Sequence, residues 1–439
     1  MQFSKMWTTF FFSILVLIII SLAVFSFPYA PLEDLPEWIY QGYIFNKLVA
    51  GAPSLDFSLK TFPVPYALFQ SIVSFCLIFV SPMITSRIVI LLYAALALFA
   101  VYRVILRYRL DGLVAWPLLI SIVILNSPFW NGYMGYQFGL IVILLYLGLP
   151  DDSQTDTRWV CLFPVLAFFA HGWAFVSILV LMGANALYQR RVAAGCVGIV
   201  PSMLLLVWYQ TYSVNPGALN ELYPVGQINI FAYKIYTLLK AAPFHNPIAL
   251  SFNASEQYGT AYLTTGLLID AIFMLALLLL VVSAIRKSDL GLILRRPQLL
   301  AGGLLVLIAA GLPRTGFGMA NPGERVLYPA MVALTIAFFA EIKFPLMPKA
   351  LLGGALLGGV ALFTFGLIGA SSHYRAAAAV LDTPAPAGKQ TISSEALFGH
   401  RLVQFDEKMK LLERAWHDDL MPTEPLAFET ALIAPRGGR

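Results

Sequence analysis

The feature that most constrains this chain is a succession of apolar runs long enough to cross a lipid bilayer. A bilayer core of roughly 30 Å needs about 20 residues of α-helix, and such runs recur along most of the 439 residues. Strands of a membrane barrel would alternate in polarity over about ten residues, and no segment here does so. The composition agrees, since 59% of the residues are hydrophobic and only 12% are charged. The sequence therefore predicts an all-α polytopic membrane protein.

Eleven segments are predicted to cross the membrane: 7–27, 84–106, 113–126, 133–149, 159–170, 172–188, 192–210, 261–285, 298–312, 326–342 and 349–370. The first is expected to be retained, because it is longer than the core of a signal peptide and lacks a convincing cleavage site. The apolar stretch 66–81 is expected to be an interfacial or re-entrant helix. Counting it as a span would move Arg103, Arg107 and Arg109 to the outer side.

Short loops then separate the charges by side of the membrane. The cytoplasmic cations are Lys5, Arg103, Arg107, Arg109, Arg158, Arg190, Arg191, Arg286, Lys287, Arg295, Arg296, Lys343 and Lys349. An excess of Lys and Arg in short cytoplasmic loops is what the positive-inside rule describes. The N-terminus is therefore predicted to be cytoplasmic, in an integral membrane protein whose default location is a bacterial inner (plasma) membrane.

Two regions follow from this topology. Residues 1–370 are expected to form a transmembrane domain, and residues 371–439 an extracytoplasmic C-terminal segment. The outer loops of the first region are 28–83, 211–260 and 313–325. Residues 397–420 have helical periodicity with charges on one side, so the small C-terminal segment is expected to pack on the outer surface as an amphipathic helix or lid.

The sequence also excludes several classes of site. Cys76, Cys161 and Cys196 all lie in apolar segments, so neither a disulfide framework nor a thiolate metal centre is expected. Lys and Arg are spread over short loops rather than gathered in a stripe, which argues against nucleic acid as a partner. No glycine loop of the nucleotide-binding type occurs, and AGCVG at 194–198 and LLGGALLGGV at 351–360 are expected to be helix-packing surfaces.

Acidic residues gather at one point of the predicted outer face. The stretch PYAPLEDLPEWIYQ at 28–41 places Glu33, Asp34 and Glu37 directly after the first apolar segment. Three outward cations near span ends, where a lipid head group would sit, are Arg87, Arg314 and Arg325. The planar guanidinium of Arg can bind two phosphate oxygens at once. The outer face therefore combines carboxylates with residues suited to phosphate.

The acid cluster and several later motifs resemble the GT-C-fold glycosyltransferases, integral membrane enzymes that take a sugar from a polyprenyl-phosphate carrier. The first outer loop is similar to theirs at Asp34, Trp38, Gly42, Phe45, Leu48 and Gly51. A Pro-flanked helix at 66–81 and Arg87 in ITSRIVILLYAAL follow in the same order. Later elements that look similar are RYRLDG, ILNSPFW, NGYMGYQFGL, HGW at 171–173 and ERVLYPAMVAL at 324–334. The resemblance covers most of the chain.

The resemblance implies a membrane glycosyltransferase that moves a hexosyl or pentosyl group from a polyprenyl-phosphate donor to an extracytoplasmic glycan, lipid or protein. Asp34 would be the general base, with Glu33 sharing that role or raising the pKa of Asp34 through like charge. Substrate contacts are expected from Glu37, Arg87, His171, Arg314, Glu324 and Arg325. Residues 126–137 lack the second acid that many members have, so no metal or other cofactor is expected unless that acid comes from elsewhere.

Simpler roles for these residues remain open at this point. Asp34 and Glu37 have the spacing of a helix-capping box. The arginines could extend to the membrane interface or pair with local acids, as Arg325 with Glu324. Asp270, inside an apolar segment, could line a lipid groove or bond to neighbouring Thr and Tyr side chains.

Two other function classes also remain open. A lipid-linked-sugar flippase or transporter would use charges or broken helices near the middle of the membrane. A glycan ligase or polymerase would be built around outer residues such as Arg314 and His171. Membrane lipids are expected partners in every case.

Overall fold

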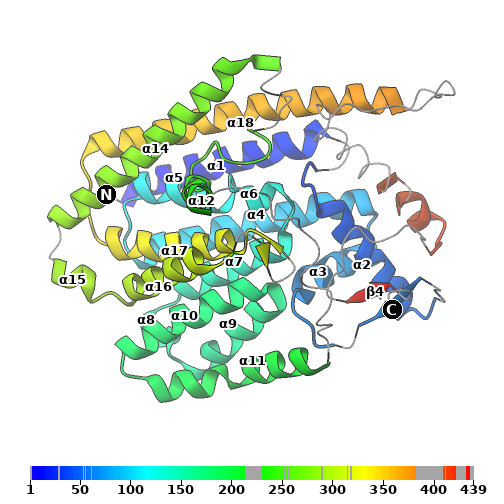
Figure 1. Cartoon of the computed structure of the whole chain (residues 1–439), viewed down its shortest axis with the longest axis horizontal. Helices are drawn as coiled ribbons and strands as arrows, with labels where there is room; N and C mark the ends of the chain where they lie inside the picture. The colour runs from blue at the N-terminus through cyan, green and yellow to red at the C-terminus, as the bar shows by residue number, and fades with distance from the viewer. Residues whose placement is uncertain are drawn as a thin grey trace.

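The computed structural model is a bundle of helices with very short strands (Figure 1). It describes residues 2–27, 30–52, 54, 56–60, 62–212, 230–250, 254, 257–287, 290–313, 315–316, 319–381, 409–410, 412–421 and 432–435. A helix covers each of the eleven segments predicted to cross a membrane: α1 (Gln2–Ser26), α4 (Pro82–Arg107), α5 (Gly112–Val123), α7 (Met134–Leu147), α9 (Thr157–Ala170), α10 (Gly172–Tyr188), α11 (Val192–Tyr212), α14 (Thr260–Lys287), α16 (Pro297–Gly311), α17 (Pro322–Phe339) and α18 (Leu346–Leu381). Six helical segments among the described residues have the length and apolar composition to cross a bilayer. The chain is therefore all-α and has the character of a membrane-embedded protein.

Shorter elements connect these helices. They are α2 (Leu35–Val49), α3 (Ala67–Phe79), α6 (Ser127–Trp130), α8 (Asp151–Gln154), α12 (Ile230–Leu239) and α15 (Leu290–Leu294). The described strands form two antiparallel pairs, β1 (Phe57–Leu59) with β4 (Ile433–Pro435) and β2 (Thr315–Gly316) with β3 (Met319–Ala320). In the first pair Phe57 lies opposite Pro435 and Leu59 opposite Ile433. Strands of two or three residues join connections rather than build a sheet.

Local sequence sets several helix starts. The side chains of Asp111, Asn126 and Asp156 accept hydrogen bonds from first-turn N–H groups at 3.1, 2.8 and 2.9 Å. Helices α5, α6 and α9 therefore begin directly after these capping residues. A proline opens α4 and α17, at a position where its missing N–H costs no helical hydrogen bond.

The centre of the bundle is formed by α5 and α7, in which nearly every residue is buried. Helices α11 and α14 instead expose long apolar faces, with Leu204 64% and Leu268 61% exposed. Apolar faces of this kind are unfavourable in water but suit contact with lipid chains. The distribution of burial thus supports a bundle whose outer helices face a membrane.

Glycines allow close packing where the sequence predicts helix-packing surfaces. A Cβ atom at Gly198 on α11 would lie 2.1 Å from Val160 Cγ1 on α9. One at Gly359 on α18 would lie 2.6 Å from the Cβ of Pro243. Because real Cβ atoms do not approach so closely, both contacts require a residue without a side chain.

One end of the bundle, at the left of Figure 1, contains the N-terminus and α8. We call it the cationic end and define it by residues 103–112, 148–158, 290–298 and 340–349. Ion pairs between its connections join Arg107 with Asp151, Arg109 with Glu341 at 3.6 Å, and Lys349 with Asp111 at 2.6 Å. These contacts join connections that are far apart in the chain. The loops that the sequence assigns to the cytoplasm therefore share one end.

The opposite end carries α2, α3 and β4, at the right of Figure 1. We call it the loop end and define it by residues 30–35, 66–67, 126–133, 171–172 and 321–325. Helix α3 covers most of the stretch predicted to be interfacial. It buries Phe69, Val73 and Leu77 against its neighbours, and it exposes Phe75, Ile78 and Phe79.

The described parts of the C-terminal segment pack on α2 and α3. Tyr43 Oη donates to the carbonyl oxygens of Ala415 and Leu420 at 2.8 and 2.9 Å, and Trp416 Nε1 donates to Leu77 O at 3.0 Å. The C-terminal segment therefore lies at the loop end, where α1 also ends.

Parts of the predicted amphipathic stretch 397–420 are described. Residues 409–410 and 412–417 are helical, and 397–408 lie outside the described residues. Helix α18 continues to Leu381, past the boundary expected at residue 370.

Candidate functional site

The loop end brings together the N-terminal ends of α2, α3, α7, α10 and α17. Helix N-termini carry a partial positive charge that favours nearby anions. Glu33 and Asp34 precede α2, His171 precedes α10, and Glu324 and Arg325 lie in the first turn of α17. Five residues predicted from the sequence thus share one end of the bundle, and several contacts tie them together.

The acidic loop is held by its backbone against the turn that precedes α7. The Glu33 N–H donates to Trp130 O at 3.4 Å, and the Asp34 N–H donates to Asn131 O at 3.1 Å. Gly132 makes this approach feasible, since it has φ of +79° and its Cβ position would lie 2.6 Å from Asp34 N. Any other residue would be strained in that conformation and would displace the loop.

The Asp34 carboxylate does not cap α2. Asp34 is the residue that precedes the helix, but its side chain makes no capping hydrogen bond. The Asp34 N–H, which a capping box would direct to Glu37, instead bonds to Asn131 O. Glu37 is fully buried and accepts a hydrogen bond from Gln41 Nε2 at 2.8 Å. Glu33 and Asp34 themselves are half-buried, so their carboxylates remain within reach of solvent.

Tyr133 connects the acidic loop with α17. The Arg325 guanidinium lies over its ring, 4.6 Å from the centroid. The Glu33 and Asp34 N–H groups bond to Trp130 and Asn131, which lie just before this tyrosine in the chain. Glu324 is the neighbour of Arg325 in the first turn of α17. Tyr133 therefore lies between the acidic loop and the start of α17. We call these five residues, Glu33, Asp34, Tyr133, Glu324 and Arg325, the acidic site.

Glu324 is fixed by an internal network rather than by Arg325. Its Oε2 accepts hydrogen bonds from Lys240 Nζ at 3.0 Å and Asn321 Nδ2 at 2.7 Å, and its Oε1 accepts one from Tyr328 Oη at 3.3 Å. The side chain is only 7% exposed. Through these partners the carboxylate holds α17 against the segment that follows α12.

His171 is buried beside Arg325 at the break between α9 and α10. Its Nδ1 accepts a hydrogen bond from the Trp173 N–H at 3.1 Å. Burial lowers the pKa of the imidazole well below its ordinary value, and the charge of Arg325 lowers it further. His171 is therefore a neutral group at pH 7. Tyr66, whose ring centroid lies 4.9 Å from that of His171, has a pKa raised by burial to about 12.

The remaining sequence-predicted residues lie away from this group. Arg87 is half-buried near the start of α4, and it forms no ion pair with a carboxylate in the described part of the chain. Arg314 lies outside the described residues. Tyr43 on α2 faces the C-terminal segment.

Asp270 has its own partners inside the bundle. Its Oδ1 accepts a hydrogen bond from the Phe244 N–H at 3.1 Å, and its Oδ2 contacts His245 Nδ1. Both side chains of the pair are at most 4% exposed. The carboxylate therefore fastens the turn at 241–250 to α14, rather than bonding to Thr or Tyr residues.

Tyr133 in the acidic site, and Tyr136 and Lys240 next to it, were not predicted from the sequence. Tyr133 and Tyr136 stand in the quoted motif NGYMGYQFGL, but nothing in that motif separates them from the many other aromatic residues of this chain. Lys240 pairs with Glu324, which lies 84 positions later. Only the folded chain reveals such a pairing.

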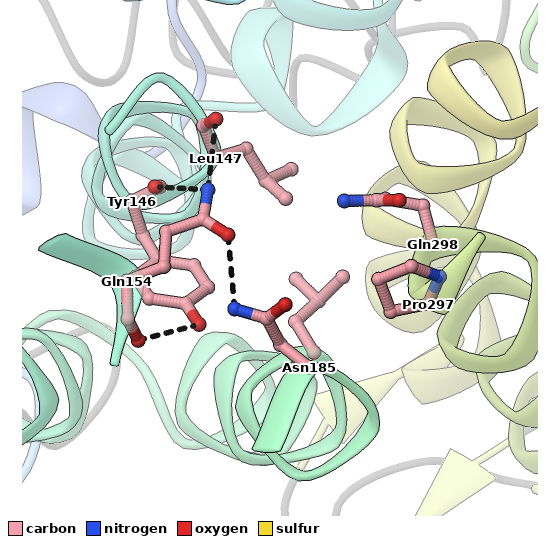
Figure 2. A pocket seen from close by; sticks show the side chains of 7 residues that line it. Tyr146, Leu147, Gln154, Asn185, Pro297 and Gln298 are labelled. Atoms are coloured by element: carbon pink, nitrogen blue, oxygen red, sulfur yellow. Dashed lines mark hydrogen bonds between the residues drawn. The ribbon is translucent and has the colours of Figure 1, made fainter. Parts of the chain in front are cut away.

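Other regions of the described structure offer no comparable group. No set of three or more His, Cys, Asp or Glu side chains among the described residues could hold a metal ion. A small polar pocket at the cationic end is lined by Tyr146, Leu147, Gln154, Leu181, Asn185, Pro297 and Gln298. Figure 2 shows Gln154 at its wall, where Nε2 donates to the Tyr146 and Leu147 carbonyls and Oε1 accepts from Asn185. These polar groups are used in joining α7, α8 and α10.

Comparison with known proteins adds no assignment. No protein-family model matches the chain, and neither a curated protein nor a solved structure gives a match. The geometry of the acidic site is therefore the basis on which a function is proposed.

Proposed function

We propose that the protein is a GT-C-like membrane glycosyltransferase that transfers a sugar from a polyprenyl-phosphate donor to a hydroxyl of an extracytoplasmic glycan, lipid or protein. The observation that carries the proposal is that the half-buried Glu33 and Asp34 are bonded to the turn before Tyr133, while the Arg325 guanidinium lies over the ring of Tyr133. Sugar transfer needs a proton acceptor and a cation at the same place, and this site offers both.

The reaction assigns a separate task to each charge. The acceptor hydroxyl oxygen attacks the anomeric carbon of the sugar, and the bond from that carbon to the phosphate oxygen breaks. The Asp34 carboxylate takes the hydroxyl proton, with Glu33 beside it. The departing phosphate keeps the bonding electron pair, and the guanidinium of Arg325 stabilises its negative charge. No redox partner is required.

The path of the chain supports a topology with eleven crossings. Residues 412–421 pack on α2 and α3, so the chain ends where it left α1. Ten of the eleven predicted crossings lie between the end of α1 and residue 412. An even number of crossings returns the chain to the side of the membrane on which α1 ends. Placing the cationic end in the cytoplasm, as the positive-inside rule demands, puts the acidic site outside.

The surroundings of the site also suit a lipid-linked donor. Helix α3 exposes Phe75, Ile78 and Phe79, and the neighbouring α4 exposes Ile84 and Leu91. An exposed apolar surface on these helices would let a polyprenyl chain remain in the bilayer while its phosphate reaches the charged residues.

The proposal is tested by transfer from a labelled panel of polyprenyl-phosphate hexoses and pentoses in proteoliposomes, with a membrane extract as acceptor. Asp34→Asn should lower transfer about a hundredfold or more, because it removes the general base. Asp56→Asn is the matched control, since Asp56 is an exposed carboxylate of the same outer region and should leave transfer unchanged. Full activity of Asp34→Asn would refute the assignment.

A flippase or transporter would need a mobile charge within the membrane. Asp270 is the described carboxylate that the sequence places there, and its two oxygens are engaged with Phe244 N–H and His245. This fixed arrangement favours the enzyme over the transporter.

A further inference from the structure

Three side chains with hydrogen-bond donors pack together next to the acidic site. The ring centroid of His171 lies 5.3 Å from that of Tyr136 and 4.9 Å from that of Tyr66, edge to face in both cases. The charge of Arg325 acts on each of these three side chains. We call Tyr66, Tyr136, His171 and Arg325 the Tyr136 cluster.

Tyr136 Oη is the least expected member of the cluster. The residue is 1% exposed, and no atom in the described part of the chain forms a hydrogen bond with its hydroxyl. Proteins pair nearly all buried hydroxyl groups, because leaving one unpaired costs stability. A tyrosine retained at such a position, where phenylalanine would fill the same space, indicates that its hydroxyl serves something other than the fold.

His171 offers a second donor within the same cluster. Since its Nδ1 accepts the Trp173 N–H, the neutral ring carries its proton on Nε2. No acceptor for that proton occurs among the described residues. Tyr66 contributes differently, because its hydroxyl oxygen lies at the start of α10, 3.5 Å from the Cβ position of Gly172.

The charges around the cluster favour an anion. Glu324 is the carboxylate that acts on Tyr136, and Lys240 neutralises it at 3.0 Å. Arg325, 7% exposed, is the charged member of the cluster, and its charge acts on both Tyr136 and His171. Two neutral donors beside a guanidinium match the oxygens of a phosphate group, which accept several hydrogen bonds at once.

We propose that Tyr136 Oη, His171 Nε2 and the Arg325 guanidinium bind the phosphate oxygens of the substrate. The assignment rests on the proposed function, since it identifies where the phosphate of the lipid-linked donor sits. Tyr136 is then a substrate-binding residue, and it separates the phosphate position from the proton-accepting carboxylates of Glu33 and Asp34.

The test compares two tyrosine-to-phenylalanine variants that differ in whether the hydroxyl has a protein partner. Tyr136→Phe removes an unpaired hydroxyl, so thermal unfolding in detergent should occur at the wild-type temperature or above it. Tyr93→Phe removes a hydroxyl that contacts Val123 O at 2.5 Å and Gln137 Oε1 at 2.7 Å, so it should unfold at a lower temperature. Binding of farnesyl phosphate, farnesol and inorganic phosphate is then measured for each protein.

Tyr136→Phe should weaken binding of farnesyl phosphate about tenfold or more, because a hydrogen bond to a charged group is lost. Tyr93→Phe should bind farnesyl phosphate as the wild type does. The binding of farnesol should be the same for Tyr136→Phe and for the wild type. If inorganic phosphate binds with the same dependence on Tyr136, a free phosphate is also a ligand of the cluster. The inference would be overturned if Tyr136→Phe bound farnesyl phosphate as the wild type does. It would also be overturned if Tyr136→Phe lost as much stability as Tyr93→Phe.

These results are independent of the transfer assay. Phosphate binding that depends on Tyr136, without transfer that depends on Asp34, would support the phosphate site and refute the glycosyltransferase. Transfer that depends on Asp34, with no effect of Tyr136→Phe on transfer or binding, would support the glycosyltransferase and refute the phosphate site.

Discussion

Gly132→Ala tests the contact that positions the acidic loop. Gly132 has φ of +79°, and an alanine Cβ there would lie 2.6 Å from Asp34 N and 2.9 Å from Leu35 N. The left-handed conformation costs an alanine about 1–2 kcal/mol. The steric contact is with backbone, which cannot rotate away, so the loop must move. Losing the hydrogen bond from the Asp34 N–H to Asn131 O adds about 0.5–1.5 kcal/mol.

The expected loss of unfolding free energy is therefore about 1.5–3.5 kcal/mol. Gly51→Ala is the matched control, because Gly51 has φ of +84° and nothing within 4 Å of its Cβ position. It should lose only the conformational part, about 1–2 kcal/mol. Unfolding in detergent, followed by tryptophan fluorescence, measures both variants.

Activity gives a second comparison between the two glycines. Gly132→Ala displaces Asp34 and should also lower sugar transfer, whereas Gly51→Ala should not. Equal stability losses together with equal transfer rates would refute the idea that the 131–132 turn holds the acidic loop in place.

Three further predictions concern the rest of the described chain. Burial lowers the pKa of His171, so its contribution to the free energy of unfolding is complete above the ordinary value of 6.5 and declines as pH falls below 6.5, by up to about 1.4 kcal/mol per pH unit. His171→Asn, which can still cap α10, should flatten this dependence of stability on pH, and an unchanged dependence would contradict the assignment of a buried neutral imidazole. Asp270→Ala should lower the free energy of unfolding by about 3–5 kcal/mol, because it leaves the Phe244 N–H and His245 unpaired in the bundle; a loss below 1 kcal/mol in a denaturant titration would count against that role. Lys47→Ala should change stability by at most about 1 kcal/mol, since its partner Asp419 is 92% exposed, and a larger loss would mean that this ion pair anchors the C-terminal segment.

The helices were predictable because their cause is local. An apolar run long enough to cross a bilayer must satisfy its backbone hydrogen bonds within itself, which only a helix does. Each of the eleven predicted segments is accordingly helical. Helix starts such as those after Asp111 and Asp156 are also visible in the sequence, since one short polar side chain precedes each apolar run.

The candidate site was predictable only in part, because its geometry depends on contacts between distant segments. The acids at Glu33 and Asp34 stand out in a chain with few charges. The pairing of Glu324 with Lys240 and the packing of Arg325 on Tyr133 depend on how α17 meets α7 and the segment that follows α12. The alternative capping role of Asp34 is not seen for the same reason, since its N–H is bonded to a turn almost a hundred residues later and its side chain makes no capping hydrogen bond.

The most direct test of the central claim is the fate of a lipid-linked sugar in proteoliposomes that contain the purified protein. The account predicts that wild-type protein releases sugar-free polyprenyl phosphate when an acceptor extract is present, and that Asp34→Asn releases none above background. Movement of the intact sugar-carrying lipid across the bilayer, without cleavage of the bond between sugar and phosphate, would contradict the account and identify a transporter instead.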